Sequence, residues 1–317
     1  MIYTFYSFKG GVGRTMALAN VAELFYRAGL KVLMVDWDLE SPGLEQFFPI
    51  HMEMLLETPG VMDMLLEYKR RMAAGLTGSE REEHLLADVL EASLVEVYPD
   101  ASGTGRLWLF PAGKRLNEHL AKYARSILTF DWLDFYQNWE GEVFFEWLRK
   151  QFERIADIVL IDSRTGMTEI GGVCTYQLAD VIVMLCAPNR QNLNGTCEMA
   201  QRFRGPWVQE LRSRRSLDVL IVPARIELGE SALLDKFHEE FVRLFEPFVP
   251  RERGIDIHQL WQAGIPYIPK YAFAESVAVR EVELASTAPM AASFRQLSQL
   301  MARLWSGASY LESTSER

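Results

Sequence analysis

The chain has 317 residues, of which 49% are hydrophobic and 24% are charged, the balance of a folded globular protein and not of a disordered one. Its formal net charge of −10 argues against wholesale binding along a nucleic-acid backbone. The longest apolar stretch, 181–187, is far shorter than the roughly 18 residues of a membrane helix, and no signal peptide precedes the first strand-like run. We therefore expect a cytoplasmic protein without an integral membrane segment. Three cysteines without metal-ligand spacing fit reduced thiols in that compartment: Cys174, Cys186 and Cys197.

Strand and helix patterns alternate from the N-terminus onward. Residues 2–8 are β-branched and aromatic, which predicts a strand. Residues 15–28 place apolar side chains at helical spacing, and 31–36 form a second apolar strand. A strand, a glycine-rich turn, a helix and a strand make one βαβ unit, whose crossover is right-handed in nearly all proteins.

The same alternation returns later in the chain. Apolar runs predict strands at 107–110, 157–162, 181–186 and 219–222, and helical patterns cover 142–155 and most of 195–211. Strands that are apolar on both faces are typical of a parallel sheet covered by helices. We predict an α/β fold with a doubly wound, mostly parallel sheet flanked by helices, with ligands at the carboxyl ends of its strands. One domain is expected over 1–309, followed by a flexible tail at 310–317.

Two segments interrupt this alternation and are predicted to be helical insertions, at about 51–104 and 115–141. The second insertion carries an aromatic cluster, which we interpret as local core in preference to a ligand cage. Its members are Phe130, Trp132, Phe135, Tyr136 and Trp139.

The first strand leads into the string Lys9-Gly10-Gly11-Val12-Gly13-Arg14-Thr15, which opens the first helix. Glycines let backbone N–H groups turn toward a phosphate, a cation neutralises the phosphate, and a hydroxyl binds Mg²⁺. We expect a nucleotide phosphate tail to bind this loop and the residue after it. The predicted binding residues are Gly10, Gly11, Val12, Gly13, Arg14, Thr15 and Met16.

This loop resembles the phosphate loop of the ParA/MinD family of dimerising ATPases, whose pattern is K-G-G-x-x-K-[ST]. The resemblance implies that Lys9 reaches the phosphates of a partner subunit across a nucleotide-sandwich dimer. The second family lysine holds the β- and γ-phosphates of its own subunit, and this chain has Arg14 at that position. Arginine keeps the charge but is longer, planar and forked, so the exchange bears directly on hydrolysis.

Two further motifs match the family in order, and with the phosphate loop they place the resemblance on 1–48 and 142–275. Residues 35–44 resemble the first switch, in which Asp38 would lie beside Mg²⁺ and the attacking water. Residues 160–166 resemble the acid that ends the Mg²⁺-linked strand together with the second switch. By this resemblance Asp162 would hold a Mg²⁺-bound water, and Gly166 would let the second switch move.

The base pocket is predicted from the segments that follow the last strands. Arg225 is expected to stack on the adenine and Pro269 to line it, although a strand-end arginine and a proline turn are an equal alternative. The polar loop at 188–192 lies at another strand end and receives no single role.

The function implied by the resemblance is an ATP-hydrolysing molecular switch that forms a nucleotide-dependent homodimer and regulates or positions an unidentified protein partner. ATP and Mg²⁺ are the expected cofactors. The predicted catalytic residues are Lys9, Arg14 and Asp38, and the predicted metal site consists of Thr15, Asp38 and Asp162.

Two other functions stay open. The first is a nucleotide-binding regulatory module with little or no hydrolysis, because Arg14 replaces the phosphate-loop lysine. The second is a kinase or transferase that uses the same loop, for which the sequence shows no acceptor pocket.

Two segments could serve the DNA binding or membrane binding found among members of the ParA/MinD family. A basic stretch could contact DNA, but a solvated helix face is favoured, and its members are Arg202, Arg204, Arg212, Arg214 and Arg215. The final helix, 294–305, is amphipathic but carries few cations, so packing on the domain is favoured over membrane binding.

Overall fold

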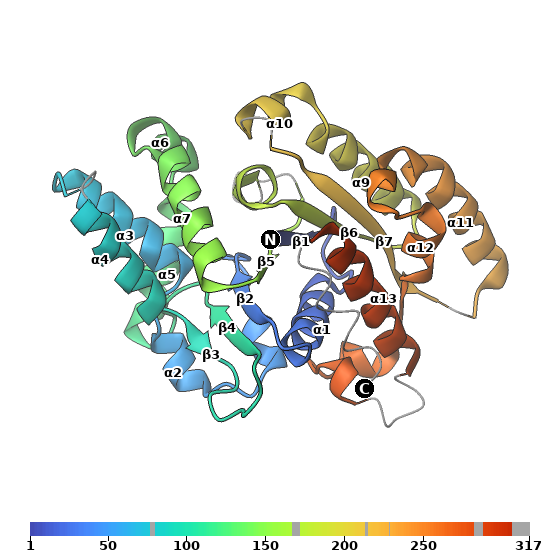
Figure 1. Cartoon of the computed structure of the whole chain (residues 1–317), viewed down its shortest axis with the longest axis horizontal. Coiled ribbons are helices and arrows are strands. Elements are labelled where there is room, and N and C mark those ends of the chain that lie inside the picture. The colour runs from blue at the N-terminus through green and yellow to red at the C-terminus, as the bar shows by residue number, and fades with distance from the viewer. Residues whose placement is uncertain (77–79, 167–171, 213–214, 228, 282–287, 306–317) are drawn as a thin grey trace.

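The computed structural model describes residues 1–76, 80–166, 172–212, 215–227, 229–281 and 288–305; the predicted flexible tail at 310–317 lies outside them. Within the described residues, eight strands form one sheet in the order β3-β4-β2-β5-β1-β6-β7-β8 (Figure 1). Neighbouring strands run parallel except for β3, which pairs antiparallel with β4. The strands are β1 (Ile2–Tyr6), β2 (Lys31–Asp36), β3 (Val95–Glu96), β4 (Arg106–Phe110), β5 (Ile158–Asp162), β6 (Val181–Cys186), β7 (Asp218–Ile226) and β8 (Ile265–Pro266).

Helices cover both faces of this sheet, which confirms the predicted doubly wound α/β fold. On one face α1 (Arg14–Arg27) packs beside α13 (Ala288–Leu304), and on the other face α7 (Gly141–Ile155) contacts β2 and β5 (Figure 1). Alternate residues of the central strands divide between the two cores, with Phe5 in one and Ile2 in the other. The remaining helices are α2 (Met52–Glu57), α3 (Val61–Ala73), α4 (Glu80–Ala92), α5 (Glu118–Thr129), α6 (Trp132–Asn138), α9 (Arg190–Phe203), α10 (Pro206–Leu211), α11 (Ser231–Phe245) and α12 (Ile257–Gln262).

The register of the central strands brings their carboxyl ends together. Asp36 at the end of β2 pairs with Asp162 at the end of β5, and Phe5 of β1 also pairs with Asp162. The loops that follow β1, β2 and β5 therefore leave the same edge of the sheet, where ligands bind in open parallel sheets.

Both predicted insertions contain helices. The first carries α2, α3, α4 and the short strand β3, and the second carries α5 and α6. Phe135 is fully buried, and its ring centroid lies 5.4 Å from that of Phe130, 6.5 Å from Trp132 and 5.8 Å from Phe144. These contacts place Phe130, Trp132 and Phe135 in local core, as predicted, although Trp132 and Tyr136 also line a cavity.

The helix predicted over 195–211 is broken in the structure. α9 ends at Phe203 and α10 begins at Pro206, which has no backbone N–H to continue the first helix. The same property suits Pro206 to the first position of a new helix. α9 also begins earlier than predicted, because the side chain of Asn189 caps it by accepting the N–H of Asn192 at 3.0 Å.

The basic stretch is not a uniformly solvated helix face. Arg212 is only 1% exposed and donates at 2.8 Å to each of the carbonyls of Tyr176 and Ser216, so the expectation of solvation is wrong for this residue. A buried guanidinium needs these acceptors because burial disfavours its charge. Arg204 donates to the carbonyls of Pro247 and Phe248, whereas Arg214 lies outside the described residues.

The final helix packs on the domain, as predicted. α13 contacts α1, α12 and β8, and its apolar side chains are buried. No helix in the described part of the chain combines the length and the apolar character that crossing a membrane requires.

The start of α3 sits against the end of β4 so closely that it requires glycine. The N–H of Val61 donates to the carbonyl of Pro111 at 2.9 Å, and a Cβ at Gly60 would lie 2.0 Å from that same oxygen. We expect Gly60→Ala to lower the free energy of unfolding by about 2 kcal/mol, because backbone atoms would have to separate. Urea denaturation measures this change. Gly103→Ala is the control, since its Cβ meets no heavy atom within 4 Å; equal midpoints for the two variants would contradict the prediction.

Candidate nucleotide site at the carboxyl edge of the sheet

The loop between β1 and α1 has the backbone of a phosphate cradle. Gly11 and Gly13 adopt φ of 74° and 87°, values that glycine tolerates at little cost, and a Cβ at Gly10 would meet no heavy atom within 4 Å. The Ser7 hydroxyl braces the loop by donating to the carbonyl of Lys9 at 2.8 Å. α1 follows directly and spans 14 residues, so its first-turn N–H groups and its dipole favour an anion at this point.

Arg14 joins this loop to the two acids predicted to act with it. Its Nε donates to Asp162 Oδ1 at 2.6 Å, and its Nη2 donates to Asp38 Oδ2 at 2.8 Å. Burial lowers the pKa of Arg14, but the two carboxylates outweigh that effect and raise it. Burial raises the pKa of Asp38, and the neighbouring Arg14 charge opposes that rise. The guanidinium is therefore the counterion of both acids.

Thr15 completes a donor set that suits Mg²⁺. Its hydroxyl lies 2.6 Å from Asp162 Oδ2, so one hydroxyl and one carboxylate meet beside the phosphate cradle. Among the described residues, no group of three or more His, Cys, Asp or Glu side chains forms a protein-only metal site. Mg²⁺ is commonly bound by one or two carboxylates together with substrate phosphates, and these residues fit that arrangement.

Asp36 is a site residue that the sequence analysis did not assign. It is fully buried and accepts the N–H groups of Asp38, Gly43 and Leu44 at 3.2, 3.1 and 3.3 Å. Burial raises its pKa well above the usual value, and the charges of Asp162 and Glu45 add to this shift. Asp36 thus closes the first switch into a loop; its place at the end of a buried strand, before a Ser-Pro-Gly turn, was the available signal.

The second switch begins directly after Asp162. The Ser163 hydroxyl donates to the carbonyl of Phe5 at 2.8 Å, and Gly166 has φ of 74° with its N–H 3.3 Å from the carbonyl of Ser7. Arg164 forms an ion pair with Glu40 of the first switch. The two switches and the phosphate loop are therefore in mutual contact; residues 167–171, which follow the second switch, lie outside the description.

A cavity of about 150 Å³ adjoins the phosphate loop on the side of β7 and β8. Arg225 lines it, donates to the carbonyl of Gly11 at 2.9 Å, and lies with its guanidinium 4.8 Å from the ring centroid of Tyr267. Tyr267 and Tyr271, which the sequence analysis did not assign, also line the cavity. Pro269 is exposed and is not among the described lining residues. Two tyrosines and the Arg225 guanidinium therefore line a cavity in the region where the base pocket was predicted.

Lys9 and the polar loop at 188–192 border the same site. Lys9 is exposed, and its ammonium has no hydrogen bond or ion pair with a described residue. Asn189 and Asn192 line a cavity of about 200 Å³ together with Gly10, Gly11 and Arg225. The structure thus brings the predicted residues Lys9, Arg14, Thr15, Asp38, Asp162 and Arg225 to one edge of the sheet.

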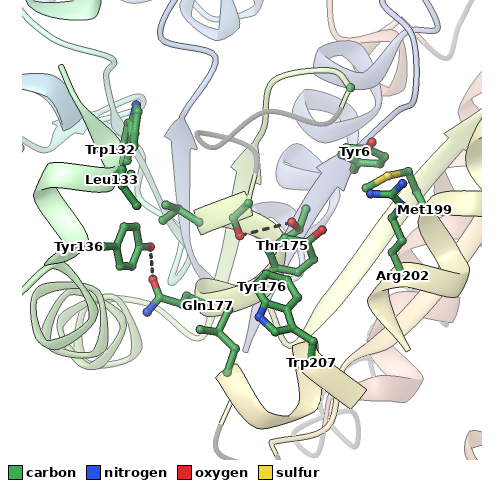
Figure 2. A pocket seen from close by; sticks show the side chains of 14 residues that line it. Tyr6, Trp132, Leu133, Tyr136, Thr175, Tyr176, Gln177, Met199, Arg202 and Trp207 are labelled. Atoms are coloured by element: carbon green, nitrogen blue, oxygen red, sulfur yellow. Dashed lines mark hydrogen bonds between the residues drawn. The ribbon is translucent and has the colours of Figure 1, made fainter. Parts of the chain in front are cut away.

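A larger cavity of about 440 Å³ lies beside the second switch (Figure 2). Trp132 and Tyr136 of α6 form one side, and Tyr6, Met199 and Arg202 form the other. Between these sides lies the turn η2 (Val173–Leu178), whose Gln177 accepts a hydrogen bond from the Tyr136 hydroxyl. Through this hydrogen bond the second insertion contacts the segment that follows the second switch.

Comparison with solved structures supports the fold. The chain aligns with MinD from Pyrococcus horikoshii OT3 complexed with Mg-ADP at a TM-score of 0.55 and 16% identity, over 97% of this chain and 98% of that one. It aligns with the cell division protein MinD from Aquifex aeolicus at a TM-score of 0.53 and 18% identity, over 93% and 96%. The MinC:MinD complex from Aquifex aeolicus gives a TM-score of 0.52 and 18% identity, over 93% and 94%. No curated protein sequence gives a match.

A family model settles the wider relationship. The model of the CobQ/CobB/MinD/ParA nucleotide binding domain matches residues 3–232, which include the phosphate loop, both switches and β1 to β7. The chain belongs to the family of CobQ/CobB/MinD/ParA nucleotide-binding domains.

Proposed function

We propose that this protein is an ATP-hydrolysing switch that dimerises around ATP and Mg²⁺ and regulates or positions a protein partner. One observation carries the proposal: Arg14, Thr15, Asp38 and Asp162 meet within hydrogen-bond distance at the carboxyl edge of the sheet, beside a phosphate cradle. The MinD of Pyrococcus horikoshii, which shares the fold, was solved with Mg-ADP. That nucleotide and metal are consistent with the donor set found here.

On this proposal, hydrolysis requires Arg14 to change partners. In the structure its guanidinium lies against the carboxylates of Asp162 and Asp38. Phosphates in the cradle would attract it away, because they are anionic acceptors that match its planar fork. Asp162 and Thr15 would then be free to hold Mg²⁺, which when bound neutralises charge on the β- and γ-phosphates.

Release of Asp38 is the second consequence of that exchange. Its carboxylate sits on the first switch and is 18% exposed, so a water molecule can reach it. Without Arg14 as its partner, Asp38 can orient an attacking water, and its position on a loop closed by Asp36 keeps it near the phosphate cradle. We propose Asp38 as the water-positioning residue and Lys9 as the cation that reaches the second subunit.

The ion pairs of Arg14 also favour the alternative function. If the guanidinium stays with Asp162 and Asp38, the acids cannot serve Mg²⁺ and water, and nucleotide binding would proceed with little hydrolysis. A regulatory module would then act through the bound nucleotide alone. Under either function the output goes to a protein partner; the Aquifex aeolicus MinD, of the same fold, was solved in a complex with MinC.

Asp38→Ala tests the hydrolysis step. We expect turnover of Mg-ATP, measured by phosphate release, to fall by roughly 100-fold or more because the water loses its orienting carboxylate. Binding of ATP should persist, since the cradle is unchanged. Arg106→Ala, whose side chain pairs with Glu96 far from this edge, is the control. Wild-type turnover that survives in Asp38→Ala would remove Asp38 from the mechanism.

Lys9→Ala tests the shared site. We expect ATP to shift wild-type protein from monomer to dimer in sedimentation velocity, and the shift to disappear in Lys9→Ala because its free ammonium neutralises the partner's phosphates. Lys114→Ala is a matched loss of one lysine outside the phosphate loop. A Lys9→Ala protein that still dimerises with ATP would show that the dimer does not depend on this residue.

Arg14→Lys separates the two functions. A single ammonium cannot bridge two carboxylates as a fork does, so we expect the nucleotide-free protein to lose about 1–3 kcal/mol of stability in thermal unfolding. Mg-ATP should recover more stability in the variant than in the wild type. Turnover in both proteins supports the ATPase; turnover in Arg14→Lys alone supports the regulatory module.

A further inference from the structure

We infer that the second insertion positions the first switch, with Tyr123 and Arg115 as positioning residues for Asp38. The two residues flank the start of α5 and contact the loop at two separate points. The inference rests on the proposed role of Asp38, but the contacts themselves do not involve the phosphate loop or its ligands.

Tyr123 provides the first contact. Its hydroxyl donates to the carbonyl of Leu39 at 2.7 Å, and this hydrogen bond is buried. Leu39 is the residue directly after Asp38, and its side chain is fully buried. A fixed carbonyl and a fixed side chain at Leu39 restrict the backbone that carries the Asp38 carboxylate.

Arg115 provides the second contact. Its Nη2 lies 2.9 Å from Glu45 Oε1, with side-chain exposures of 7% and 4%, and its guanidinium lies 6.0 Å from the ring centroid of Tyr123. Glu45 follows Leu44, whose N–H donates to Asp36. A buried ion pair of this kind strongly resists removal of one partner, so it fixes the end of the loop as Tyr123 fixes its beginning.

These two contacts differ in kind from the other restraints on the loop. Asp38 is also held by Arg14, and Glu40 by Arg164, but those partners belong to the phosphate loop and the second switch. Both are expected to rearrange when nucleotide binds. The contacts from Tyr123 and Arg115 come from outside that machinery, so they can hold the first switch in place while Arg14 changes partners.

The same insertion also reaches the segment after the second switch. Tyr136 of α6 donates to Gln177 (Figure 2). Asp134 of α6 is itself paired at 2.9 Å with Lys69 of α3, in the first insertion. The insertion therefore contacts the first switch at Leu39 and the segment after the second switch at Gln177. A partner that displaces α5 would change the position of Asp38 without touching the nucleotide.

Hydrogen exchange of the whole chain, followed by mass spectrometry, tests the inference without nucleotide. We expect Tyr123→Phe to speed exchange of the backbone amides in peptides covering 37–45 by about tenfold, because the loop loses one buried restraint. Tyr3→Phe is the matched control, since Tyr3 also donates a buried hydroxyl to a backbone carbonyl, that of Met301, at 2.7 Å. Equal exchange of 37–45 in Tyr123→Phe and the wild type would overturn the inference.

A second variant guards against general loss of structure. Arg115→Met combined with Glu45→Gln removes the ion pair and leaves no unpaired buried charge, and the same rise in exchange over 37–45 is expected, with peptides of β6 unchanged. A rise of the same size in the β6 peptides would assign the effect to global stability and overturn the positioning role.

Turnover supplies a separate measurement. With Mg-ATP we expect Tyr123→Phe to lower kcat by about tenfold and to change KM by less than about twofold, because Asp38 acts on water and not on nucleotide binding. If the wild type hydrolyses ATP and Tyr123→Phe has the same kcat, the role of Tyr123 is contradicted. If the wild type shows no turnover, the proposed hydrolysis fails, and the exchange rates still decide whether the insertion holds the first switch.

Discussion

The approach of three carboxylates at one edge of the sheet is the constraint around which this site is built. Asp36 and Asp162 are register partners on neighbouring parallel strands, and Asp38 follows two residues after Asp36. Carboxylates this close and this poorly hydrated repel one another unless each has donors. Three main-chain N–H groups of the first switch serve Asp36, and Arg14 serves Asp38 and Asp162. The same three carboxylates therefore hold both the first switch and the start of the helix that follows the phosphate loop.

Much of the fold could be predicted because its central strands are apolar on both faces. The runs that form β2, β5 and β6 match the predicted strands to within one residue, since nothing polar interrupts them before the acid or the turn that ends them. The strands β3 and β8 were missed because two residues carry no detectable periodicity. The break between α9 and α10 was missed as well, although Pro206 marked it.

The residues of the candidate site also fall into those that the sequence could predict and those that it could not. Arg14, Thr15 and Asp162 could be found because each lies at a strand end or a helix start within a motif of fixed spacing. Tyr123 could not be found, because its hydroxyl meets Leu39 across 84 positions of sequence and no local pattern marks that contact. Such contacts depend on how an insertion docks, which is decided by tertiary packing and not by periodicity.

This geometry shows what an arginine does at position 14, where the family pattern has a lysine. A lysine offers one compact charge, whereas the planar guanidinium of Arg14 contacts two acids, at 2.6 and 2.8 Å. On the proposed function, the guanidinium moves to the phosphates and Asp162 would hold Mg²⁺, so the buried acid has a cation beside it with or without nucleotide. The protein would then have two arrangements, one with Arg14 on the acids and one with Arg14 on the phosphates. Nucleotide can switch the protein between them because it binds the second arrangement more tightly than the first. When Arg14 leaves Asp38, the backbone of the first switch keeps its position only if contacts from outside the phosphate loop still hold it. Tyr123 and Arg115 of the insertion provide such contacts, at Leu39 and Glu45.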